Sequence, residues 1–392
     1  MNILYLVPHV PGPTKARSHF HIQGLREAGH TVTIATLERN LADRQRIQQL
    51  RDSGVTVLAT RISQMQSALN SLSVLPTRLP LQMAFMWSPH LMSQIRNYLK
   101  QTSPDIIHVE HLRMARYGLQ LVQDWPVIWD AVDCLAPLYR QAISLGVNRP
   151  LQIISILETP RLQWYERWLT SQFPAILTIS QIDQHALQNN NPYADRIHVA
   201  PLGIPIPPLP PITERSKNIL VITGTLNYHP NVAAVHYFVN KIFPLVLKQK
   251  PDVQLQLVGA HPDPSIQALR SASIEITGFV PSLYEYLQRA TIALAPVTYG
   301  TGTQIKVIEA FLTETPLVAT SVAVRGLDIQ HQEQALIADT PADFAAAILR
   351  LLDDPTLHTR IGQAGKQYAE QHHNLSQTTA QLIEQYAGII GK

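Results

Sequence analysis

The chain has 392 residues, 45% of them hydrophobic, which suits two domains with substantial cores and excludes wholesale disorder. Its formal net charge of +3 comes without a concentrated basic stripe, so we expect no nucleic-acid partner. The single cysteine, Cys134, rules out an internal disulfide and cannot by itself hold a structural zinc. The first residues lack the basic region of a signal peptide, and no segment approaches the ~20 apolar residues that span a bilayer. We therefore expect a cytoplasmic protein.

The first half alternates between strand and helix patterns. An apolar run at 3–7 predicts a buried parallel strand, and a Pro/Gly loop and a helical pattern over 15–28 follow it. Further strands are expected at 30–36, 55–59, 105–109, 127–129, 175–179 and 197–200. Helical patterns lie between most of them, and Pro160 suits the first turn of one that covers 160–171. This alternation predicts a parallel sheet with helices on both faces.

A proline-rich stretch, 201–211, follows this half. Its prolines exclude a helix interior and a central strand, so it predicts a semi-rigid linker at a domain boundary. We place an N-terminal domain at 1–205 and a C-terminal domain at 212–375. A last helix, 376–392, could pack back on the first domain.

The second half repeats the alternation. Strands are expected at 218–222, 253–258, 273–277, 291–295, 316–319 and 335–338. A helix over 231–249 should break at Pro244, and three helices close the chain at 341–353, 356–372 and 376–389. The sequence thus predicts an α/β protein with two Rossmann-like, doubly wound domains facing a central cleft, where ligands bind.

The most informative stretch, 295–310, runs from a strand end through a small-residue loop into a helix. Gly300 and Gly302 would let the backbone approach a phosphate, and the free N–H groups of the helix end favour an anion. Glu309 lies near the helix face of Lys306 and could accept two hydrogen bonds from a ribose diol. An ordinary turn with an exposed Lys306–Glu309 pair explains these residues equally well. The loop lacks the third glycine of a dinucleotide fingerprint and the ending of a P-loop.

This stretch resembles the donor site of the large retaining glycosyltransferase family called group 1. The family's typical run is G-S-G-T-R-L-K-x-L-E-A-(x)-x-x-G-x-P-V-V-(S/A)-T, and the similarity here continues to residue 327. It extends to 224–231, which resembles G-S-M-x-Y-x-P-N, and to 257–259 and 277–281. It covers essentially the whole second half, and the ordered set is far more specific than any one motif. The resemblance implies the GT-B architecture.

Carried over residue by residue, the resemblance implies a donor site. Glu309 would hold the ribose hydroxyls, and residues 279–280 would flank the base. Backbone amides of 302–304 would meet the diphosphate or the donor sugar, with residues 224–225 near the diphosphate. The donor-binding residues implied in this way are Gly224, Thr225, Phe279, Val280, Gly300, Gly302, Thr303, Gln304, Lys306 and Glu309.

Two positions of the run depart from the family. Many members have two glutamates separated by seven residues, but the first falls here at Thr301, so Glu309 stands alone. The subgroup with G-S-G-T-R-L-K also lacks that first carboxylate, so the change concerns how the donor sugar's hydroxyls are held. The usual arginine is Gln304 here, which leaves Lys306 as the nearest cation for the diphosphate.

The resemblance is looser in the first half. Residues 11–17 take the place of the family's glycine-rich loop, which faces the acceptor and the donor phosphate, but the paired glycines are missing. Lys15 or Arg17 could meet the diphosphate or an anionic acceptor. A solvated first helical turn is the alternative interpretation.

Residues 105–111 occupy the place of D-x-x-H-x-H in many members, with Glu110 at the second histidine. Glu110 leaves the strand at its C-terminal end, so we expect it in the active site with His111, whereas His108 lies deeper as a structural histidine. Asp133 ends another strand, where it could orient a sugar or cap the next helix. Because this architecture positions phosphate with helix ends and cations, we expect no essential metal and no cofactor.

The implied reaction is transfer of a glycosyl unit from a nucleoside-diphosphate sugar to an acceptor hydroxyl with retention, in glycan, polysaccharide or glycolipid synthesis. The departing phosphate would help to take the acceptor proton, so no strong enzyme base is required. The acceptor could be a carbohydrate, a lipid-linked glycan or a small molecule. Two alternatives are a sugar-nucleotide epimerase of the same architecture and a non-catalytic relative that binds a nucleotide-sugar.

Residues 76–89 are apolar and proline-rich. If exposed, they would suit a lipid-linked or bulky acceptor and a peripheral contact with the cytoplasmic face of a membrane. A buried segment between elements is the interpretation that we prefer.

Overall fold

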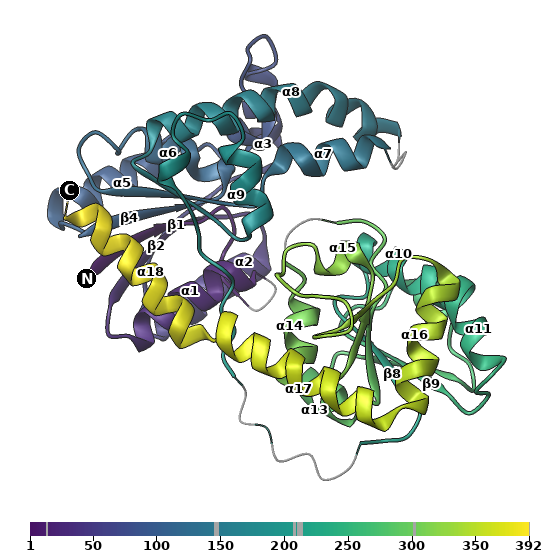
Figure 1. Ribbon diagram of the computed structural model, residues 1–392. Helices are drawn as coiled ribbons and strands as arrows, with labels where there is room; N and C mark the ends of the chain where they lie inside the picture. Colours follow the sequence, from purple (N-terminus) through teal and green to yellow (C-terminus); the bar gives the residue numbers. More distant parts are fainter. Residues whose placement is uncertain (13–14, 145–148, 207–208, 210–214, 301–302, 392) are drawn as a thin grey trace. The chain divides into compact units, whose positions relative to one another are not determined.

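The computed structural model describes residues 1–12, 15–144, 149–206, 209, 215–300 and 303–391 (Figure 1). The chain forms two compact units. One comprises Met1–Ile204 together with Leu375–Lys392, and the other comprises Pro205–Asn374. None of the helices within these described ranges combines the length and apolar composition needed to cross a bilayer.

A parallel sheet in the order β3-β2-β1-β4-β5-β6-β7 forms the centre of the first unit. Its strands are β1 (Asn2–Leu6), β2 (Thr31–Glu38), β3 (Thr56–Arg61), β4 (Ile106–Glu110), β5 (Val127–Val132), β6 (Ala175–Thr178) and β7 (Ile197–Val199). The chain adds strands on one side of β1 and then moves to β4 on its other side. The topological switch point therefore lies between β1 and β4, the edge at which α/β sheets bind ligands.

Helices cover both faces of this sheet (Figure 1). The helices of this unit are α1 (Ala16–Glu27), α2 (Leu41–Asp52), α3 (Gln64–Ser73), α4 (Leu81–Phe85), α5 (Pro89–Gln101), α6 (Ala115–Leu119), α7 (Leu135–Ser144), α8 (Arg149–Gln172), α9 (Gln181–Gln188) and α18 (Leu375–Ile390), of which α3 supplies no residue to either core cluster. Alternate residues of β1 supply two cores: Tyr5 packs with α1, α2 and α18, whereas Leu4 packs with α5, α6 and α8.

The last helix, α18, completes the first unit. Tyr386 is fully buried in the core beneath α1. The two helices approach closely because α1 carries Gly24, where a Cβ atom would lie 2.0 Å from Oγ1 of Thr379. The helix thus closes a sheet face that the first 204 residues leave partly uncovered.

The expectation that a helix begins at Pro160 is wrong, because α8 begins at Arg149 and carries Pro160 in its interior. An interior proline costs about 3 kcal/mol. On the C-terminal side of Pro160, Leu162, Tyr165 and Leu169 are fully buried in the core. Each buried side chain of this size contributes roughly 1.5–3 kcal/mol, so burial outweighs the broken hydrogen bond.

The second unit has a parallel sheet in the order β10-β9-β8-β11-β12-β13. Its strands are β8 (Ile219–Thr223), β9 (Gln254–Val258), β10 (Ile274–Gly278), β11 (Ile292–Ala295), β12 (Leu317–Ala319) and β13 (Leu336–Ile337). Its helices are α10 (His229–Tyr237), α11 (Phe243–Leu247), α12 (Pro264–Gln267), α13 (Leu283–Arg289), α14 (Ile305–Leu312), α15 (Ser321–Val324), α16 (Pro341–Asp353) and α17 (Pro355–His372). The switch point lies between β8 and β11.

The helix expected over 231–249 with a break at Pro244 is interrupted before Pro244. A π-helical turn, Phe238–Ile242, separates α10 from α11, and Pro244 lies in the first turn of α11. Pro is tolerated there because the N–H groups of a first turn have no partner within the helix. Phe238 and Phe243 bury their rings in the core on either side of the break.

Candidate functional site

The expected donor loops meet at the switch point of the second sheet. The strand β8 ends at Thr223 and runs into Gly224 and Thr225, while β11 ends at Ala295 and leads through Gly300 to α14. Because β8 and β11 are neighbours and parallel, both loops leave the same edge of the sheet. The sequence motifs therefore converge although about 70 residues separate them.

Two hydrogen bonds join the loop after β8 to α14. Lys306 donates from Nζ to Oδ1 of Asn231 over 2.7 Å, and Asn231 donates from Nδ2 to the carbonyl of Thr225 over 3.0 Å. Gly224 has a φ of +140°, and a Cβ atom there would lie 2.9 Å from Nδ2 of Asn231. The backbone at residue 224 can approach this pair only because it carries no side chain. Lys306 is half-buried rather than part of an exposed pair.

The site holds one cation and one carboxyl group that both titrate near neutrality. Burial lowers the pKa of Lys306 to about 8, against an opposing attraction from Glu309. Burial raises the pKa of Glu309 to about 7, against the opposing charge of Lys306. Tyr284 of α13 lies close enough to Glu309 that the pKa of its phenol is raised by burial and by that charge. A bound anion would favour the protonated lysine, and donated hydroxyls would favour the carboxylate.

Aromatic side chains surround this edge of the sheet. His229 and Tyr299 stack with ring centroids 5.6 Å apart, and Nδ1 of His229 lies 2.8 Å from the hydroxyl of Tyr299. These rings link the loop after β8 to the loop after β11. Phe279 is 78% exposed at the end of β10, and Val280 beside it is half-buried. An exposed phenyl ring is available to stack on a flat base.

The beginning of α14 is described in part. Gln304 is the residue preceding the helix, and its side chain makes no capping hydrogen bond among the described residues. Thr303 is half-buried, and a Cβ atom at Gly326 would lie 3.1 Å from its hydroxyl. Thr301 and Gly302 lie outside the described residues. The N–H of Val307 donates to the carbonyl of Gln304 over 2.9 Å, whereas the N–H groups of Ile305 and Lys306 have no partner among the described residues. Those two N–H groups could meet an anion.

In the first unit, Glu110 and His111 lie at the switch-point end of β4. Glu110 is buried and accepts a 3.1 Å hydrogen bond from the Tyr5 hydroxyl. Burial and the charge of Asp130 raise the pKa of Glu110 to about 8. Burial and Arg113 lower the pKa of His111 to about 3. At neutral pH this strand end therefore presents a protonated carboxyl group and a neutral imidazole.

Two residues at this edge have unusual backbone conformations. His111 has a φ of +69° after β4, and Val132 has a φ of +65° at the end of β5. Positive φ is strained for a β-branched residue such as valine. Strain of this kind is retained where the surrounding structure enforces it, commonly at functional sites.

The phosphate-binding role expected for Arg17 needs correction. Arg17 is buried, and its Nε and Nη2 donate to the two carboxylate oxygens of Asp130 over 2.7 and 2.9 Å. Its Nη1 donates to the carbonyl of Ala200 over 2.8 Å. Each guanidinium nitrogen therefore already has a partner. The charge of Arg17 is used to stabilise Asp130 within the core.

Asp130 is also 3.3 Å from Nε2 of His108, which confirms His108 as a buried histidine. Nδ1 of His108 lies 2.8 Å from the hydroxyl of Tyr386 on α18. His21, His108 and Asp130 lie close enough to share a cation. Arg17 already supplies positive charge to both Asp130 oxygens, so we assign no metal to this group.

Near the β1–β4 edge, Lys15 lies with two cations, Arg39 and Arg113, that the sequence did not indicate. Lys15 is exposed, and its pKa is lowered by partial burial and by Arg39 and Arg113. Nη1 of Arg113 lies 3.2 Å from Nε2 of His9, whose pKa burial lowers to about 2. Because these residues come from separate segments, no motif could have shown that they gather.

Asp133 does not cap the helix that follows it. The N–H of Cys134 donates to Oδ1 of Asp183 over 3.0 Å, and the N–H of Leu135 donates to Oε1 of Glu166 over 2.7 Å. Oδ1 of Asp133 is buried and has no hydrogen-bond partner among the described residues. Burial and the charge of Asp183 raise the pKa of Asp133 to about 7. The capping interpretation of Asp133 is therefore wrong.

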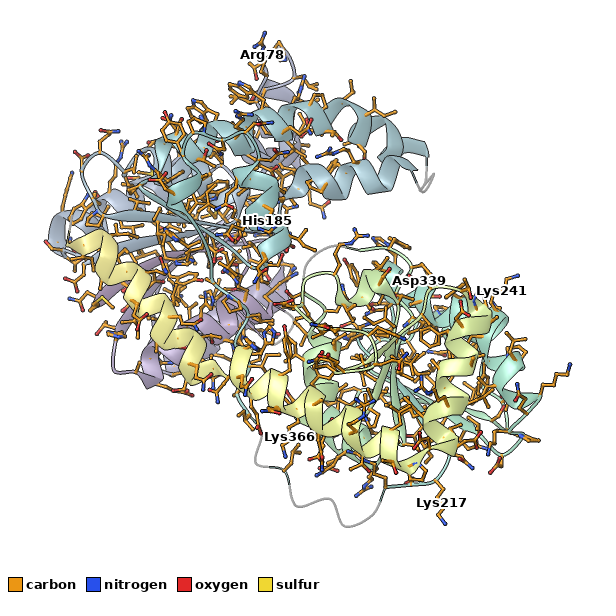
Figure 2. The ribbon with its side chains drawn as sticks, in the orientation of Figure 1. Arg78, His185, Lys217, Lys241, Asp339 and Lys366 are labelled. Carbon is orange, nitrogen blue, oxygen red and sulfur yellow. The ribbon has the colours of Figure 1, made fainter. Side chains whose placement is uncertain are left out.

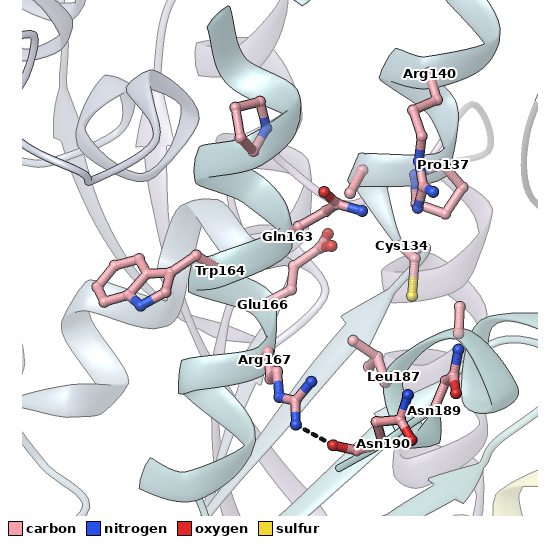
Figure 3. A pocket seen from close by; sticks show the side chains of 13 residues that line it. Cys134, Pro137, Arg140, Gln163, Trp164, Glu166, Arg167, Leu187, Asn189 and Asn190 are labelled. Carbon is pink, nitrogen blue, oxygen red and sulfur yellow. Dashed lines mark hydrogen bonds between the residues drawn. The ribbon is translucent and has the colours of Figure 1, made fainter.

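Glu166 lines a cavity of about 520 Å³ between α7, α8 and α9 (Figure 3). Its polar lining includes Arg140, Gln163, Glu166, Arg167 and Asn190. Arg167 donates to the carbonyl of Asn190, which fixes one wall. Nothing in the sequence pattern indicated this cavity, because its walls come from three separate helices.

Two family models match the chain over most of both units. The model described as glycosyl transferases group 1 matches residues 217–354, and that described as Glycosyltransferase Family 4 matches residues 19–206. With its two Rossmann-like units, the fold is that of a GT-B glycosyltransferase. The chain belongs to the group 1 glycosyltransferases.

Curated relatives are similar over different shares of their length. The MMP alpha-(1->4)-mannosyltransferase of Mycolicibacterium hassiacum is 24% identical over 314 residues, which are 72% of this chain and 75% of that protein. An uncharacterized 44.6 kDa protein in the cps region of Klebsiella pneumoniae is 28% identical over 141 residues, or 34% of this chain. The matched part spans only 36% of that protein's length.

Solved structures share the fold along the whole chain. Sucrose-phosphate synthase from Thermosynechococcus elongatus is 16% identical with a TM-score of 0.70, covering 100% of this chain and 99% of that one. HepE from Anabaena, in complex with UDP and glucose, is 14% identical with a TM-score of 0.68 and covers 99% of this chain and 100% of that one. These likenesses support the architecture.

Proposed function

We propose that this chain transfers a sugar from a nucleoside-diphosphate sugar to an acceptor hydroxyl, with retention of the anomeric configuration. The observation that carries the proposal is the meeting of Gly224, Lys306 and Glu309 at the β8–β11 switch point. The closely approaching backbone at Gly224 and the half-buried ammonium of Lys306 suit the diphosphate of such a donor, and the carboxyl group of Glu309 suits its ribose. HepE, which has the same fold, was solved with UDP-glucose, and this supports the proposed donor class.

The hard step of the reaction is departure of the diphosphate while positive charge grows on the sugar. Lys306 and the first N–H groups of α14 would stabilise the negative charge on the leaving group. Glu309 would accept the ribose hydroxyls, and Phe279 would stack on the base. A departing phosphate oxygen takes the acceptor proton as the new glycosidic bond forms. The proposal requires no metal, because protein cations supply the charge.

The acceptor is proposed to bind at the β1–β4 edge of the first unit. His111 accepts the Arg113 N–H at Nδ1 over 3.2 Å, so its Nε2 carries the proton and can donate to an acceptor oxygen. Glu110 offers a second polar group there, and Asp133 contributes a carboxyl oxygen that has no partner in the part of the chain that the structure describes. Lys15, with Arg39 and Arg113 near it, would favour an acceptor that carries negative charge.

The test combines binding with turnover. Thermal shift with UDP, GDP, ADP and CDP should reveal one diphosphate that raises the melting temperature by mass action. The corresponding nucleotide-sugars should then be hydrolysed slowly by the wild type and not by Glu309→Ala. A protein that none of the diphosphates stabilises would contradict the proposed donor site.

The same assay separates the two rival functions. An epimerase would convert the donor sugar into its epimer without any acceptor, and nuclear magnetic resonance of the donor would show this. A non-catalytic relative would bind the diphosphate, yet donor hydrolysis would proceed at the same background rate in the wild type and in Glu309→Ala.

A further inference from the structure

Exposed apolar side chains gather on α3 in the first unit. Met65, Leu69 and Leu72 are 74%, 55% and 57% exposed. Their spacing of four and three residues places them on one face of the helix. Leu75, which follows the helix, is exposed as well. A helix that packed its apolar face on the core would bury these residues, so this face is left for something outside the unit.

The helix α8 continues this apolar face. Ile154, Leu157 and Trp164 are exposed, and their spacing of three and seven residues places them on one side of the helix. Arg161, on the same side, donates from Nη2 to the carbonyl of Leu75 over 2.7 Å, so α8 lies directly beside the end of α3 (Figure 1). We call the combined set the α3–α8 surface: Met65, Leu69, Leu72, Leu75, Ile154, Leu157 and Trp164.

The charged side chains that border the α3–α8 surface are positive. The sequence has no Asp or Glu from Ser53 to Pro104, whereas Arg61 and Arg78 flank α3. Figure 2 shows Arg78 at the outer end of the segment that follows α3. The acid of α8 nearest to this surface, Glu158, is buried and accepts the N–H of Leu81 over 2.7 Å. The apolar residues are therefore bordered by arginines without an exposed acid between them.

We propose that the α3–α8 surface docks the protein on a bilayer that contains anionic phospholipids. The leucines and Met65 would enter the boundary between headgroups and acyl chains, while Arg78 contacts phosphate. Trp164 has the amphipathic ring that favours the depth of the headgroups. A second copy of this chain is a poorer occupant, since it would place the same arginines opposite one another. Lipid headgroups supply the complementary charge.

The proposed membrane contact lies on the α3–α8 surface and not on residues 76–89, where the sequence suggested it. Within 76–89, Met83, Ala84 and Met86 are buried, and Trp87 packs against the core. The interpretation of this stretch as a buried segment between elements is confirmed, because α4 serves as a core element between α3 and α5. The exposed apolar residues lie before it, on α3, whose pattern is amphipathic but contains no charge.

Flotation of the full chain with vesicles tests the proposal. One preparation is phosphatidylcholine alone, and the other is phosphatidylcholine mixed with phosphatidylglycerol. We expect the wild type to float with the mixed vesicles. The triple variant Met65→Gln, Leu69→Gln and Leu72→Gln should reduce the vesicle-bound fraction by at least about tenfold, because buried apolar area sets interfacial affinity. Arg78→Glu should reduce binding to the mixed vesicles in particular.

The matched control is Leu41→Gln on α2. Leu41 is 68% exposed and belongs to the same unit, but it lies outside the α3–α8 surface. We expect this variant to float like the wild type, and circular dichroism should show that all variants keep the fold.

Three results would overturn the proposal. They are a wild type that floats with neither vesicle, a triple variant that floats undiminished, and light scattering that shows a wild-type dimer which the triple variant turns into a monomer. Glycosyl transfer is not needed for flotation, so failure of one proposal leaves the other intact.

Discussion

Lys306 and Asn231 are joined by a 2.7 Å hydrogen bond from Nζ to Oδ1 across the switch point of the second sheet. Asn231 is itself fixed by its bond to the carbonyl of Thr225. The ammonium group is thus held in a half-buried position at the proposed diphosphate site. Its desolvation makes the charge costly in the free protein, and an arriving diphosphate would relieve that cost.

Affinity for the nucleoside diphosphate should be bell-shaped in pH, with its maximum between about 7 and 8. The pKa of Glu309 is raised to about 7, so below that pH the carboxyl group gains a proton and loses acceptor capacity for ribose hydroxyls. The pKa of Lys306 is lowered to about 8, so above that pH the ammonium loses its charge. Calorimetric titration from about pH 6 to about pH 9 would show both limbs.

Two variants should show which residue causes the acidic limb of this pH profile and which causes the alkaline limb. Lys306→Arg should remove the alkaline limb, because a guanidinium stays protonated well above this range. Glu309→Gln should remove the acidic limb, since the amide does not titrate. A profile that is flat in the wild type would show that neither group contacts the ligand.

Glu309→Gln should also weaken diphosphate binding by about 10- to 100-fold, because a hydrogen bond to a charged group contributes roughly 1.5–3 kcal/mol. A double-mutant cycle between Glu309 and the ribose tests this prediction. Removing the 2′-hydroxyl from the nucleotide should lower the affinity of the wild type, but it should lower the affinity of Glu309→Gln only slightly. Glu333→Gln, an exposed change in the same unit, is the control. If the two losses were fully additive, Glu309 would not be the group that holds the ribose.

Gly224→Ala should reduce donor affinity strongly. The new Cβ atom would lie 2.9 Å from Nδ2 of Asn231 and 3.5 Å from Nζ of Lys306, so the side chains that form the site must shift. Gly29→Ala is a matched control, because Gly29 also has a positive φ (+83°) but nothing lies within 4 Å of its added Cβ. Both variants should lose stability from backbone strain, and only Gly224→Ala should lose binding. If the two variants bound the donor equally well, the backbone at residue 224 would not approach the donor closely.

The sequence predicted most strands and the two Rossmann-like sheets because their signals are local. Apolar runs such as that of β1, turn glycines and proline-rich links are read within a few residues. The motifs around Gly224 and Glu309 also lie at strand ends, where parallel topology brings them to one edge. That inference needs strand order alone and no side-chain contact.

The partners of Arg17 could not be predicted in the same way. Asp130 is 113 residues from Arg17 in the chain, and the two carboxylate hydrogen bonds exist only once β5 and α1 are packed. Position in the loop motif suggested a phosphate ligand for Arg17, whereas burial gives it a structural partner. Ion pairs of this kind depend on which side chains share a desolvated space, and sequence spacing carries no such information.

Breaking this ion pair should destabilise the first unit markedly. Asp130→Asn or Arg17→Met should each lower the free energy of unfolding by about 3–5 kcal/mol, since one buried charge loses its partner. Burial raises the pKa of Asp130, but Arg17 and His108 hold it below its ordinary value. Stability from Asp130 is therefore present above about pH 4 and declines as the pH falls through the folded-state pKa.

Urea unfolding of the two single variants and of the double variant measures the coupling between Arg17 and Asp130. We expect the double variant to lose less than the sum of the single losses, because it leaves neither charge unpaired. Additive losses would mean that the two side chains act independently despite their contact.

Variants of Asp133 and Asp183 should show that Asp133 acts in the reaction, whereas Asp183 stabilises the fold. Asp183 accepts the N–H of Cys134 where α7 begins, so Asp183→Ala should lower the free energy of unfolding by about 1 kcal/mol. Oδ1 of Asp133 is buried without a partner among the described residues, and burial raises the pKa of this carboxyl group to about 7. Asp133→Ala should therefore raise the free energy of unfolding at neutral pH while lowering acceptor-dependent turnover at least tenfold. Asp183→Asn keeps the accepting oxygen but removes the charge that raises the pKa of Asp133, so the acidic limb of turnover should move to lower pH. Normal turnover by Asp133→Ala would show that this carboxylate does not contact the acceptor.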